Sequence, residues 1–197
     1  MTVNELQIQL DISSGNESDV LNKYARETRY GYIFVDSLNG QCYLLDEHGK
    51  IDDIRKVKNI GDWAFSNYTS IKSIIIPDSV ESIGSYTFAY CTSLKHITIP
   101  GSVKSIGDGA FAGCTSLESI TIPDSVRSIG DDAFYHCKFL KSIIIPDSVE
   151  SIGYWAFKGC ASLNEVIFKG KTIDQIEAMD NYHWGIKDRS IIKCQIS

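Results

Sequence analysis

The chain is 197 residues long, which is enough for one domain or one short repeat array with a buried core. Hydrophobic residues make up 43% and charged residues 22% of it, close to the globular average, so the chain as a whole is not expected to be disordered. A net charge of −6 argues against nucleic acid or an anionic membrane as the main partner, because both call for clustered lysine and arginine.

The first 30 residues show no recognisable targeting signal. Met1 to Tyr30 lacks the basic start and the apolar run of a secretion signal. No stretch of the chain approaches the roughly 20 apolar residues that a membrane span needs. As written, the chain is therefore expected to be cytoplasmic, without insertion into a membrane.

Residues 1–56 do not repeat and are expected to form an N-terminal cap. Ser18 to Arg29 predicts a short helix with Ser18 as its N-cap. Gly31–Asp36 and Gln41–Asp46 predict two strands on either side of an Asn-Gly pair, which is a hairpin signal. Such a cap would protect an exposed sheet edge, and the sequence leaves open whether it has a further role.

Residues 57–168 repeat with a period of 23 residues, which predicts five coils. The four prolines of the chain mark the period, at Pro77, Pro100, Pro123 and Pro146. The template that the coils share is Val, Ile-Gly, a small residue followed by Phe, then Cys, and a closing L-x-x-I-x-I-P pattern. In the second coil these residues are Val80, Ile83, Gly84, Thr87, Phe88, Cys91, Leu94, Ile97, Ile99 and Pro100. Tyr68 replaces the cysteine in the first coil, and the fifth coil lacks the proline.

The closing pattern predicts a strand and the middle of each coil predicts a turn. His96–Ile99 alternates polar and β-branched apolar residues, and Pro100 ends the strand because it has no N–H to donate. The repeated glycine supplies either a positive φ or a close backbone approach. The G-x-x-A-F-x-x-C segment predicts a single helical or 3₁₀ turn. Because one coil cannot bury its own apolar residues, the coils are expected to stack into a right-handed solenoid with a parallel β-sheet.

The motif I-P-x-S-V-x-S-I-G-x-x-A-F-x-x-C-x-S-L-x-x-I-x-I-P resembles the BspA-like, or Treponema pallidum-type, leucine-rich repeat family. The resemblance covers Val57 to Phe168. It implies a leucine-rich repeat solenoid of the kind found in adhesins and surface proteins that bind other proteins, such as components of the extracellular matrix. By this resemblance the chain would lie on the cell surface or be secreted.

Residues 169–197 are expected to form a C-terminal cap. Ile173 to Met179 predicts a brief helix, and Ser190 to Gln195 predicts a last strand over the final coil. Trp184 and Tyr182 are expected to shield the apolar edge there.

The repeat places four cysteines, Cys91, Cys114, Cys137 and Cys160, one above another. A parallel ladder does not converge on one point as zinc ligands must, and a disulfide needs side chains turned toward each other. Cys42 and Cys194 fall at opposite ends. The six thiols are therefore expected to be free, with the four stacked ones acting as small buried hydrophobes, and no metal site is predicted.

No catalytic constellation stands out. Of four histidines, His96 is expected to face outward between Ser73 and Ser119, with no carboxylate nearby to orient it as a triad requires. Phosphate-binding glycine loops, zinc-protease motifs and paired-carboxylate clefts do not occur in the sequence. The sequence therefore predicts a protein that is not an enzyme and that binds no cofactor.

Because five coils share one template, positions that vary among them are candidates for partner binding. Two outward columns of the strands vary, and their residues are Ser73, His96, Ser119, Ser142 and Glu165 in one and Ile75, Thr98, Thr121, Ile144 and Ile167 in the other. The turns vary at Trp63, Tyr86, Tyr90, Tyr135, Tyr154 and Trp155. The middle coil has Gly109 and Gly113 there. Aromatic residues dominate binding hot spots, but they could equally fill grooves between coils.

The leading hypothesis is therefore a non-enzymatic, monomeric protein-binding module of the adhesion or host-interaction type. The alternative is an intracellular regulator or inhibitor that binds a bacterial protein, which the lack of a recognisable secretion signal favours.

Overall fold

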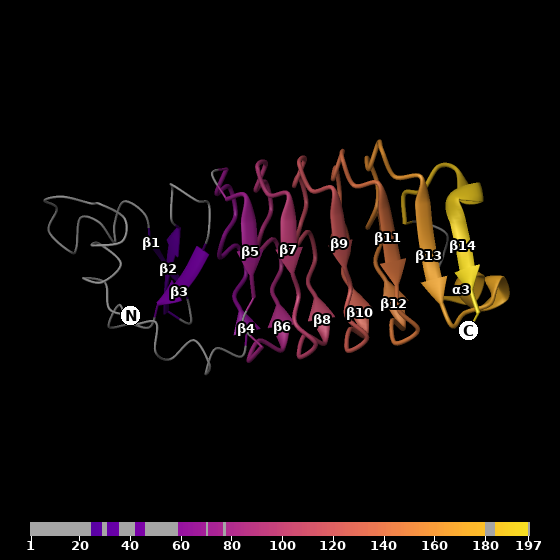
Figure 1. The fold of residues 1–197 in the computed structure, drawn as a ribbon, viewed down its shortest axis with the longest axis horizontal. Helices are drawn as coiled ribbons and strands as arrows, with labels where there is room; N and C mark the ends of the chain where they lie inside the picture. The colour runs from indigo at the N-terminus through magenta and orange to yellow at the C-terminus, as the bar shows by residue number, and fades with distance from the viewer. Residues whose placement is uncertain are drawn as a thin grey trace, which may run out of the picture.

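The computed structural model describes residues 25–28, 31–35, 42–45, 59–69, 71–76, 78–179 and 184–196. Figure 1 shows the described residues from 59 onward as a row of coils that runs toward the C-terminal end of the chain. Neighbouring coils lie side by side, so each position of the repeat forms a column along the row.

Three strands precede the coils and form a small antiparallel sheet. They are β1 (Ala25–Thr28), β2 (Gly31–Val35) and β3 (Cys42–Leu45), in the order β1-β2-β3. The predicted pair of strands within 31–46 is confirmed. The predicted helix is wrong over Ala25–Thr28, because all four residues pair with β2, and this pairing overrides their local helical preference. The rest of that predicted helix, with its N-cap Ser18, lies outside the described residues.

Each coil contributes two strands to two separate walls of the solenoid. The longer strands are β5 (Ser73–Ile75), β7 (His96–Thr98), β9 (Ser119–Thr121), β11 (Ser142–Ile145) and β13 (Glu165–Lys169). The shorter strands are β4 (Asn59–Ile60), β6 (Ser82–Ile83), β8 (Ser105–Ile106), β10 (Ser128–Ile129) and β12 (Ser151–Ile152). Paired strands are parallel, and equivalent residues of successive coils face each other. The chain is thus a parallel β-solenoid, as predicted. The longer strands form two sheets, β5-β7 and β9-β11-β13 with a last strand beside β13, and the shorter strands form one sheet that the sequence did not reveal.

The core is a set of side-chain columns between the two walls. The five repeat phenylalanines stack face to face, with ring centroids 5.0 to 5.6 Å apart. Their column residues are Phe65, Phe88, Phe111, Phe134 and Phe157, and all five are buried. The valine, isoleucine and leucine columns of the repeat are buried beside them. Burial of these columns is the main source of stability, because no coil could bury them alone.

The repeated glycine provides a close backbone approach and not a positive φ. A Cβ on Gly107 would lie 2.6 Å from the carbonyl carbon of Gly84 and 2.7 Å from the backbone nitrogen of Ser85. Gly84, Gly130 and Gly153 are equally crowded. At the same place the Gly107 N–H donates to the Ile83 carbonyl, 2.8 Å away, which joins the two coils.

The turn that follows each glycine is a series of reverse turns. Alternate residues make the i→i−3 bonds of the predicted 3₁₀ turn, as from the Ser66 N–H to the Trp63 carbonyl at 3.1 Å. The residues between them donate to the next coil instead, as from the Phe65 N–H to the Thr87 carbonyl at 2.7 Å. Bonds within and between coils therefore alternate along the turn, so it does not become a continuous helix.

The C-terminal end adds a partial sixth turn. Helix α3 (Ile173–Ala178) is followed by the 3₁₀ helix η2 (Arg189–Ile191) and by β14 (Ile192–Gln195), which pairs in parallel with β13. The predicted helix is confirmed over Ile173–Ala178 and the predicted strand over Ile192–Gln195, whereas Ser190 and Ile191 of that predicted strand lie in η2.

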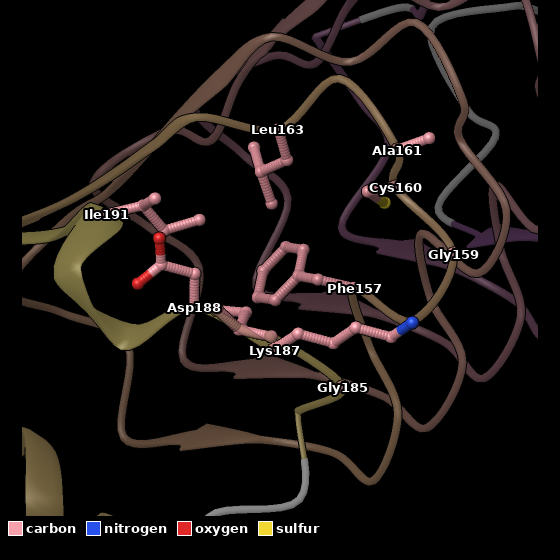
Figure 2. A pocket seen from close by; sticks show the side chains of 10 residues that line it. Phe157, Gly159, Cys160, Ala161, Leu163, Gly185, Lys187, Asp188 and Ile191 are labelled. Carbon is pink, nitrogen blue, oxygen red and sulfur yellow. The ribbon is translucent and has the colours of Figure 1, made fainter.

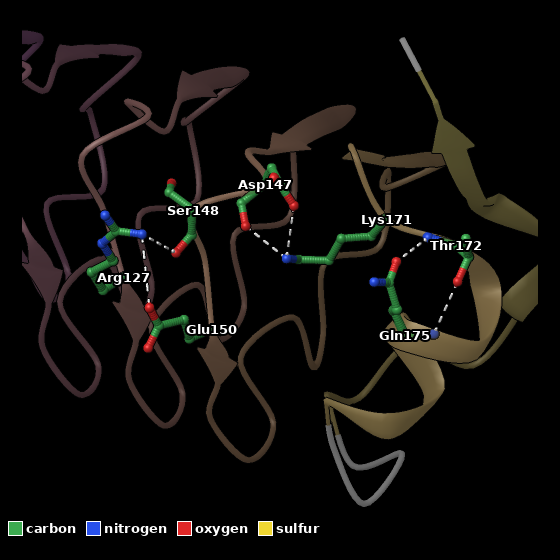
Figure 3. A network of polar contacts seen from close by, with 7 residues as sticks. All are labelled: Arg127, Asp147, Ser148, Glu150, Lys171, Thr172 and Gln175. Atoms are coloured by element: carbon green, nitrogen blue, oxygen red, sulfur yellow. Dashed lines mark hydrogen bonds and ion pairs between the residues drawn. The ribbon is translucent and has the colours of Figure 1, made fainter.

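Polar contacts fix Lys171 and Thr172, the two residues directly before α3 (Figure 3). Lys171 Nζ donates to the Asp147 carbonyl at 2.6 Å and pairs with the Asp147 carboxylate at 3.2 Å. Thr172 and Gln175 then form a capping box, in which each side chain accepts a hydrogen bond from the backbone of the other.

Trp184 closes the solenoid where a further coil would lie. It is 3% exposed, and its ring stacks on Phe168 at 5.5 Å. Its Nε1 donates to the Ile152 carbonyl at 3.2 Å, where the repeat glycine of a following coil would otherwise donate. The predicted shielding by Trp184 is confirmed, and Tyr182 lies outside the described residues.

Candidate partner-binding surface

The outer face of the longer strands is mostly polar. His96, Thr98, Ser119, Thr121 and Ile144 are exposed. Ser73, Ser142, Glu165 and Ile167 are half-buried, and the side chain of Ile75 lies outside the described residues. Ile144 and Ile167 lie opposite each other on β11 and β13. The two predicted outward columns are thus present, but among the described side chains they leave a small apolar pair and not a broad patch.

Two positions of every turn adopt a left-handed backbone. They are the second and the sixth residue after the glycine, with φ between 53° and 79°. The first left-handed column consists of Trp63, Tyr86, Gly109, Asp132 and Trp155, and the second of Asn67, Tyr90, Gly113, His136 and Gly159. Glycine and asparagine take this conformation readily, whereas bulky aromatic residues rarely do.

The six variable aromatic residues of the turns, called the aromatic strip, are Trp63, Tyr86, Tyr90, Tyr135, Tyr154 and Trp155. At the N-terminal end of this strip, aromatic rings pack on the middle coil. Trp63 stacks on Tyr86 with ring centroids 4.2 Å apart and an interplanar angle of 11°. The Tyr86 ring in turn lies directly over Gly109, where no Cβ could fit beside it. Tyr90 lies over Gly113 in the same way. The two glycines therefore leave no gap in the strip, because rings of the preceding coil cover them.

Aromatic residues at the C-terminal end of the strip form two further groups. Tyr135 contacts the ring of His136 edge to face at 4.3 Å. Tyr154 packs against Trp155 at 4.5 Å, and Lys158 Nζ lies 3.2 Å from the centroid of the Trp155 ring. Of the six predicted aromatic residues, Trp63, Tyr90, Tyr154 and Trp155 are exposed, whereas Tyr86 and Tyr135 are half-buried.

The stacked cysteines take part in packing and in hydrogen bonds between coils. Each Sγ lies 3.1 Å from the carbonyl oxygen of the phenylalanine one coil earlier. Burial raises the pKa of Cys91 and Cys160 to about 12, and raises the pKa of Cys114 and Cys137 well above the usual value. A thiol that stays protonated is a poor nucleophile and a poor metal ligand, so the column is structural.

A model of the BspA type leucine-rich repeat region, with six repeat copies, matches residues 50–182. The chain belongs to the BspA-type leucine-rich repeat family.

Three solved structures of leucine-rich repeat proteins illustrate the similarity. The T. pallidum leucine-rich repeat protein is 26% identical, with a TM-score of 0.57 over 72% of this chain and 70% of that one. A leucine-rich cell surface protein from Faecalibacterium prausnitzii A2-165 is 30% identical, with a TM-score of 0.61 over 80% of this chain and 42% of that one. A leucine-rich repeat protein from Bacteroides ovatus ATCC 8483 is 26% identical, with a TM-score of 0.52 over 73% and 46%. The chain therefore spans less than half the length of the last two relatives.

The comparison with curated proteins gives no match. BspA-type repeats are typically non-enzymatic. Within the part of the chain that the structure describes, no three His, Cys, Asp or Glu side chains gather as metal ligands would, and no helix is long and apolar enough to cross a membrane. His96 pairs across the sheet with Ser73 and is exposed, as predicted.

Two features of the BspA-type surface escaped the sequence analysis. Phe139 is 58% exposed and stands where neighbouring coils have Ser116 and Ser162. The same comparison among coils could have found it. The second feature is a set of aspartates beside the glycine, of which Asp108 accepts from the Asp131 N–H at 2.9 Å and Asp131 from the Tyr154 N–H at 2.6 Å. Only the structure shows that these carboxylates bond to the next coil.

Proposed function

We propose that this chain is a protein-binding module that uses the aromatic strip of its turns, defined as Trp63, Tyr86, Tyr90, Tyr135, Tyr154 and Trp155. The observation that carries the proposal is the first left-handed column. Gly109 and Asp132 occupy it in two coils, so the fold does not require an aromatic residue there. Trp63 and Trp155 nevertheless occupy it with φ of 61° and 57°, and both are exposed.

Backbone conformations of this kind cost on the order of 1 kcal/mol for a residue other than glycine and concentrate at functional sites. Tryptophan and tyrosine are also the residues that contribute most to protein interfaces, because they bury a large rigid area at low conformational entropy. Trp63, Tyr90 and Trp155 are exposed on a left-handed backbone, and Tyr90 lies over Gly113. Such a surface suits the recognition of another protein.

The similarity to a cell surface protein from Faecalibacterium prausnitzii supports a partner outside the cell. The proposal is accordingly recognition of host or matrix proteins, as in adhesion. The alternative, an intracellular regulator, differs in where the partner is found, so one experiment can separate the two.

The test uses substitutions by residue types that already occur at equivalent positions of other coils. Trp63→Asn, Tyr90→Asn and Trp155→Asn together remove three exposed rings while asparagine keeps the left-handed backbone, as Asn67 already does. Ile144→Thr with Ile167→Thr alters the sheet face and follows Thr98 and Thr121 of the same column. Both variants should stay folded, as circular dichroism would show.

Binding is measured by surface plasmon resonance against purified matrix proteins and against fractionated host-surface and native cytosolic proteins. We expect the wild type to bind a matrix or surface protein, the triple variant to lose at least tenfold in affinity, and the sheet variant to match the wild type. Saturable binding to a cytosolic protein alone would favour the intracellular regulator. Equal affinity of the wild type and the triple variant would rule out the strip as the binding site.

A further inference from the structure

A row of carboxylates runs beside the aromatic strip. The residue directly after the repeat glycine is an aspartate in three of the five coils, Asp62, Asp108 and Asp131, and all three are exposed. Asp62 directly precedes the exposed Trp63, and Asp131 accepts the N–H of the exposed Tyr154 at 2.6 Å. Exposed rings and exposed carboxylates therefore lie next to each other at both ends of the strip.

Hydrogen bonds between coils hold these carboxylates in place. One oxygen of Asp62 accepts the Ser85 N–H at 2.7 Å, and one oxygen of Asp108 accepts the Asp131 N–H at 2.9 Å. An ionised carboxylate has two oxygens with about four lone-pair sites, so each aspartate can accept further hydrogen bonds from a partner. Because the backbone bonds fix these side chains before binding, a cationic partner loses less free energy in ordering them.

The surface of the turns is negatively charged. From the repeat glycine to the cysteine position, the charged residues of the five coils are Asp62, Asp108, Asp131, Asp132 and Lys158. Directly before the shorter strands, Lys104 pairs with Glu81 at 3.7 Å. Arg127 pairs with Glu150 there at the same distance, so these neighbouring charges compensate one another. The negative charge of the turns is therefore not balanced and attracts a positively charged partner.

Lys158 shows that a ring of the strip accepts a cation. Its Nζ lies 3.2 Å from the centroid of the Trp155 ring, which is a cation–π contact. Trp63 and Tyr90 are each 50% exposed, so a ligand can reach their rings as well. The guanidinium group of arginine suits such a surface best, because it stacks on aromatic faces and donates two parallel hydrogen bonds to a carboxylate.

The pocket at the C-terminal end of the solenoid offers no comparable surface. Figure 2 shows Phe157, Leu163 and Ile191 around it, with Lys187 and Asp188 beside them. Phe157 is only 2% exposed, so its ring has no open face for a ligand. Open ring faces next to carboxylates are thus a feature of the strip and not of this pocket.

We propose that the aromatic strip binds a segment of its protein partner that presents arginine side chains. The proposal rests on the proposed function, because the binding surface is the same. Each arginine stacks on an exposed ring and pairs with the adjacent carboxylate. Neighbouring coils lie about 4.8 Å apart, so Asp62 and Asp108 are about 10 Å apart along the row. An extended segment spans this distance with about three residues, so arginine at every third position matches the row.

The probe is a twelve-residue glycine–serine peptide with arginine at every third position. Its control carries citrulline in place of arginine, which keeps the shape of the side chain and removes the charge. Isothermal titration calorimetry with the full chain measures both affinities. We expect the arginine peptide to bind saturably and the citrulline peptide to bind at least tenfold more weakly. Equal affinity of the two peptides, or no binding of the arginine peptide to a folded sample, would overturn the proposal.

A pair of double variants separates the strip from the net charge of the chain. Asp62→Asn with Asp131→Asn removes two charges beside the rings, while the amide oxygens can still accept the backbone N–H groups. Asp78→Asn with Asp124→Asn removes two charges from exposed residues in the turns before the shorter strands. The first pair should weaken the arginine peptide at least fivefold and the second less than twofold. Equal losses would mean attraction by net charge alone and would also overturn the proposal.

The protein partner found by surface plasmon resonance distinguishes this proposal from the proposed function. We expect it to lose affinity for the triple ring variant and for Asp62→Asn with Asp131→Asn. Loss with the ring variant alone would show that the strip binds its partner without arginine, and only the arginine proposal would fail. Equal affinity of the ring variant and the wild type would instead remove the strip as the binding site, and both proposals would fail.

Discussion

The Sγ of Cys137 lies 3.1 Å from the carbonyl oxygen of Phe111 one coil earlier, and this contact ties two buried columns together. The same carbonyl accepts the N–H of Cys114 at 3.1 Å, so it keeps one partner if the thiol is lost. The cysteine column is thus a packing element that also adds a weak bond between each pair of coils.

Replacing Cys137 by alanine should therefore destabilise the chain mainly because it leaves a cavity. The Phe111 carbonyl would still accept the Cys114 N–H, so its loss of the thiol should matter less. We expect the free energy of unfolding to fall by about 1–2 kcal/mol, measured by urea denaturation. The control is Cys194→Ala on the exposed strand β14, which should change stability by less than about 0.5 kcal/mol. Equal effects of the two substitutions would contradict a packing role for the column.

Thiol reactivity should also distinguish the buried cysteines of the column from the exposed Cys194. Because burial raises the pKa of Cys114 and Cys137, these thiols stay protonated at pH 8, whereas Cys194 is exposed. A brief pulse of iodoacetamide on the native protein, read by peptide mass spectrometry, should label Cys194 first. Cys160, with a pKa raised to about 12, should also resist. Labelling of Cys137 as fast as Cys194 would show that the column opens in the native state.

Two glycines of one coil offer a matched test of close backbone approach. Gly107→Ala places a methyl group against backbone atoms of the preceding coil and should destabilise by more than about 2 kcal/mol, as overpacking does. Gly101→Ala has nothing within 4 Å of the new Cβ and should be neutral or stabilise by up to about 1 kcal/mol. Thermal denaturation followed by circular dichroism measures both. A tolerated Gly107→Ala would mean that the coils can move apart without cost.

The repeat made most of this fold predictable, because each column is sampled five times in one sequence. The burial of Phe111, Leu117 and Cys114 follows from that repetition alone. The second sheet was not foreseen, because a Ser-Ile pair is too short to be recognised as a strand and forms one only by stacking. The left-handed turns were missed because Trp63 and Tyr86 occupy a conformation that their residue types rarely adopt.

The aromatic strip was foreseen as a set of residues, but its support was not. Nothing in the sequence indicates that Tyr86 and Tyr90 lie over the glycines of the next coil. The position of Trp184 was equally hidden, because it depends on the hydrogen bond from the Phe157 N–H to the Trp184 carbonyl, which forms where the 23-residue period has ended. Sequence periodicity predicts what repeats, and both of these features arise where the repeat is broken.

Trp184 should stabilise the C-terminal end by its indole N–H as well as by its area. Trp184→Phe keeps a ring against Phe168 but leaves the buried carbonyl of Ile152 without its donor. We expect a loss of about 1–3 kcal/mol, with faster hydrogen exchange confined to β12, β13 and β14. Exchange that rises equally in β6 and β8 would instead indicate that the whole solenoid unfolds as one unit.

Asp132 should oppose folding at neutral pH, and an amide in its place should relieve this. One of its carboxylate oxygens is buried without a hydrogen-bond partner in the described structure. Burial raises its pKa most, and the charge of Asp131 raises it further. Lys158 lowers this pKa, and Asp108 raises it by less than either of these two neighbours changes it. A carboxylate with a raised folded-state pKa favours the fold while protonated, and that contribution is lost as the pH rises through the folded pKa.

Asp132→Asn should therefore raise the Tm at pH 7, by on the order of 1–2 °C because the group is only partly buried, and the gain should vanish below the unfolded pKa near 3.8. Asparagine also tolerates the left-handed backbone at this position, where φ is 53°, so the substitution adds no strain. Asp188→Ala provides the opposite sign, since the hydrogen bonds from Ser190 lower the pKa of Asp188 and favour its charged form. The Tm of that variant should be lower than that of the wild type at pH 7 and equal to it in acid. A gain for Asp132→Asn that is equal at pH 3 and pH 7 would mean that packing, and not charge, is responsible.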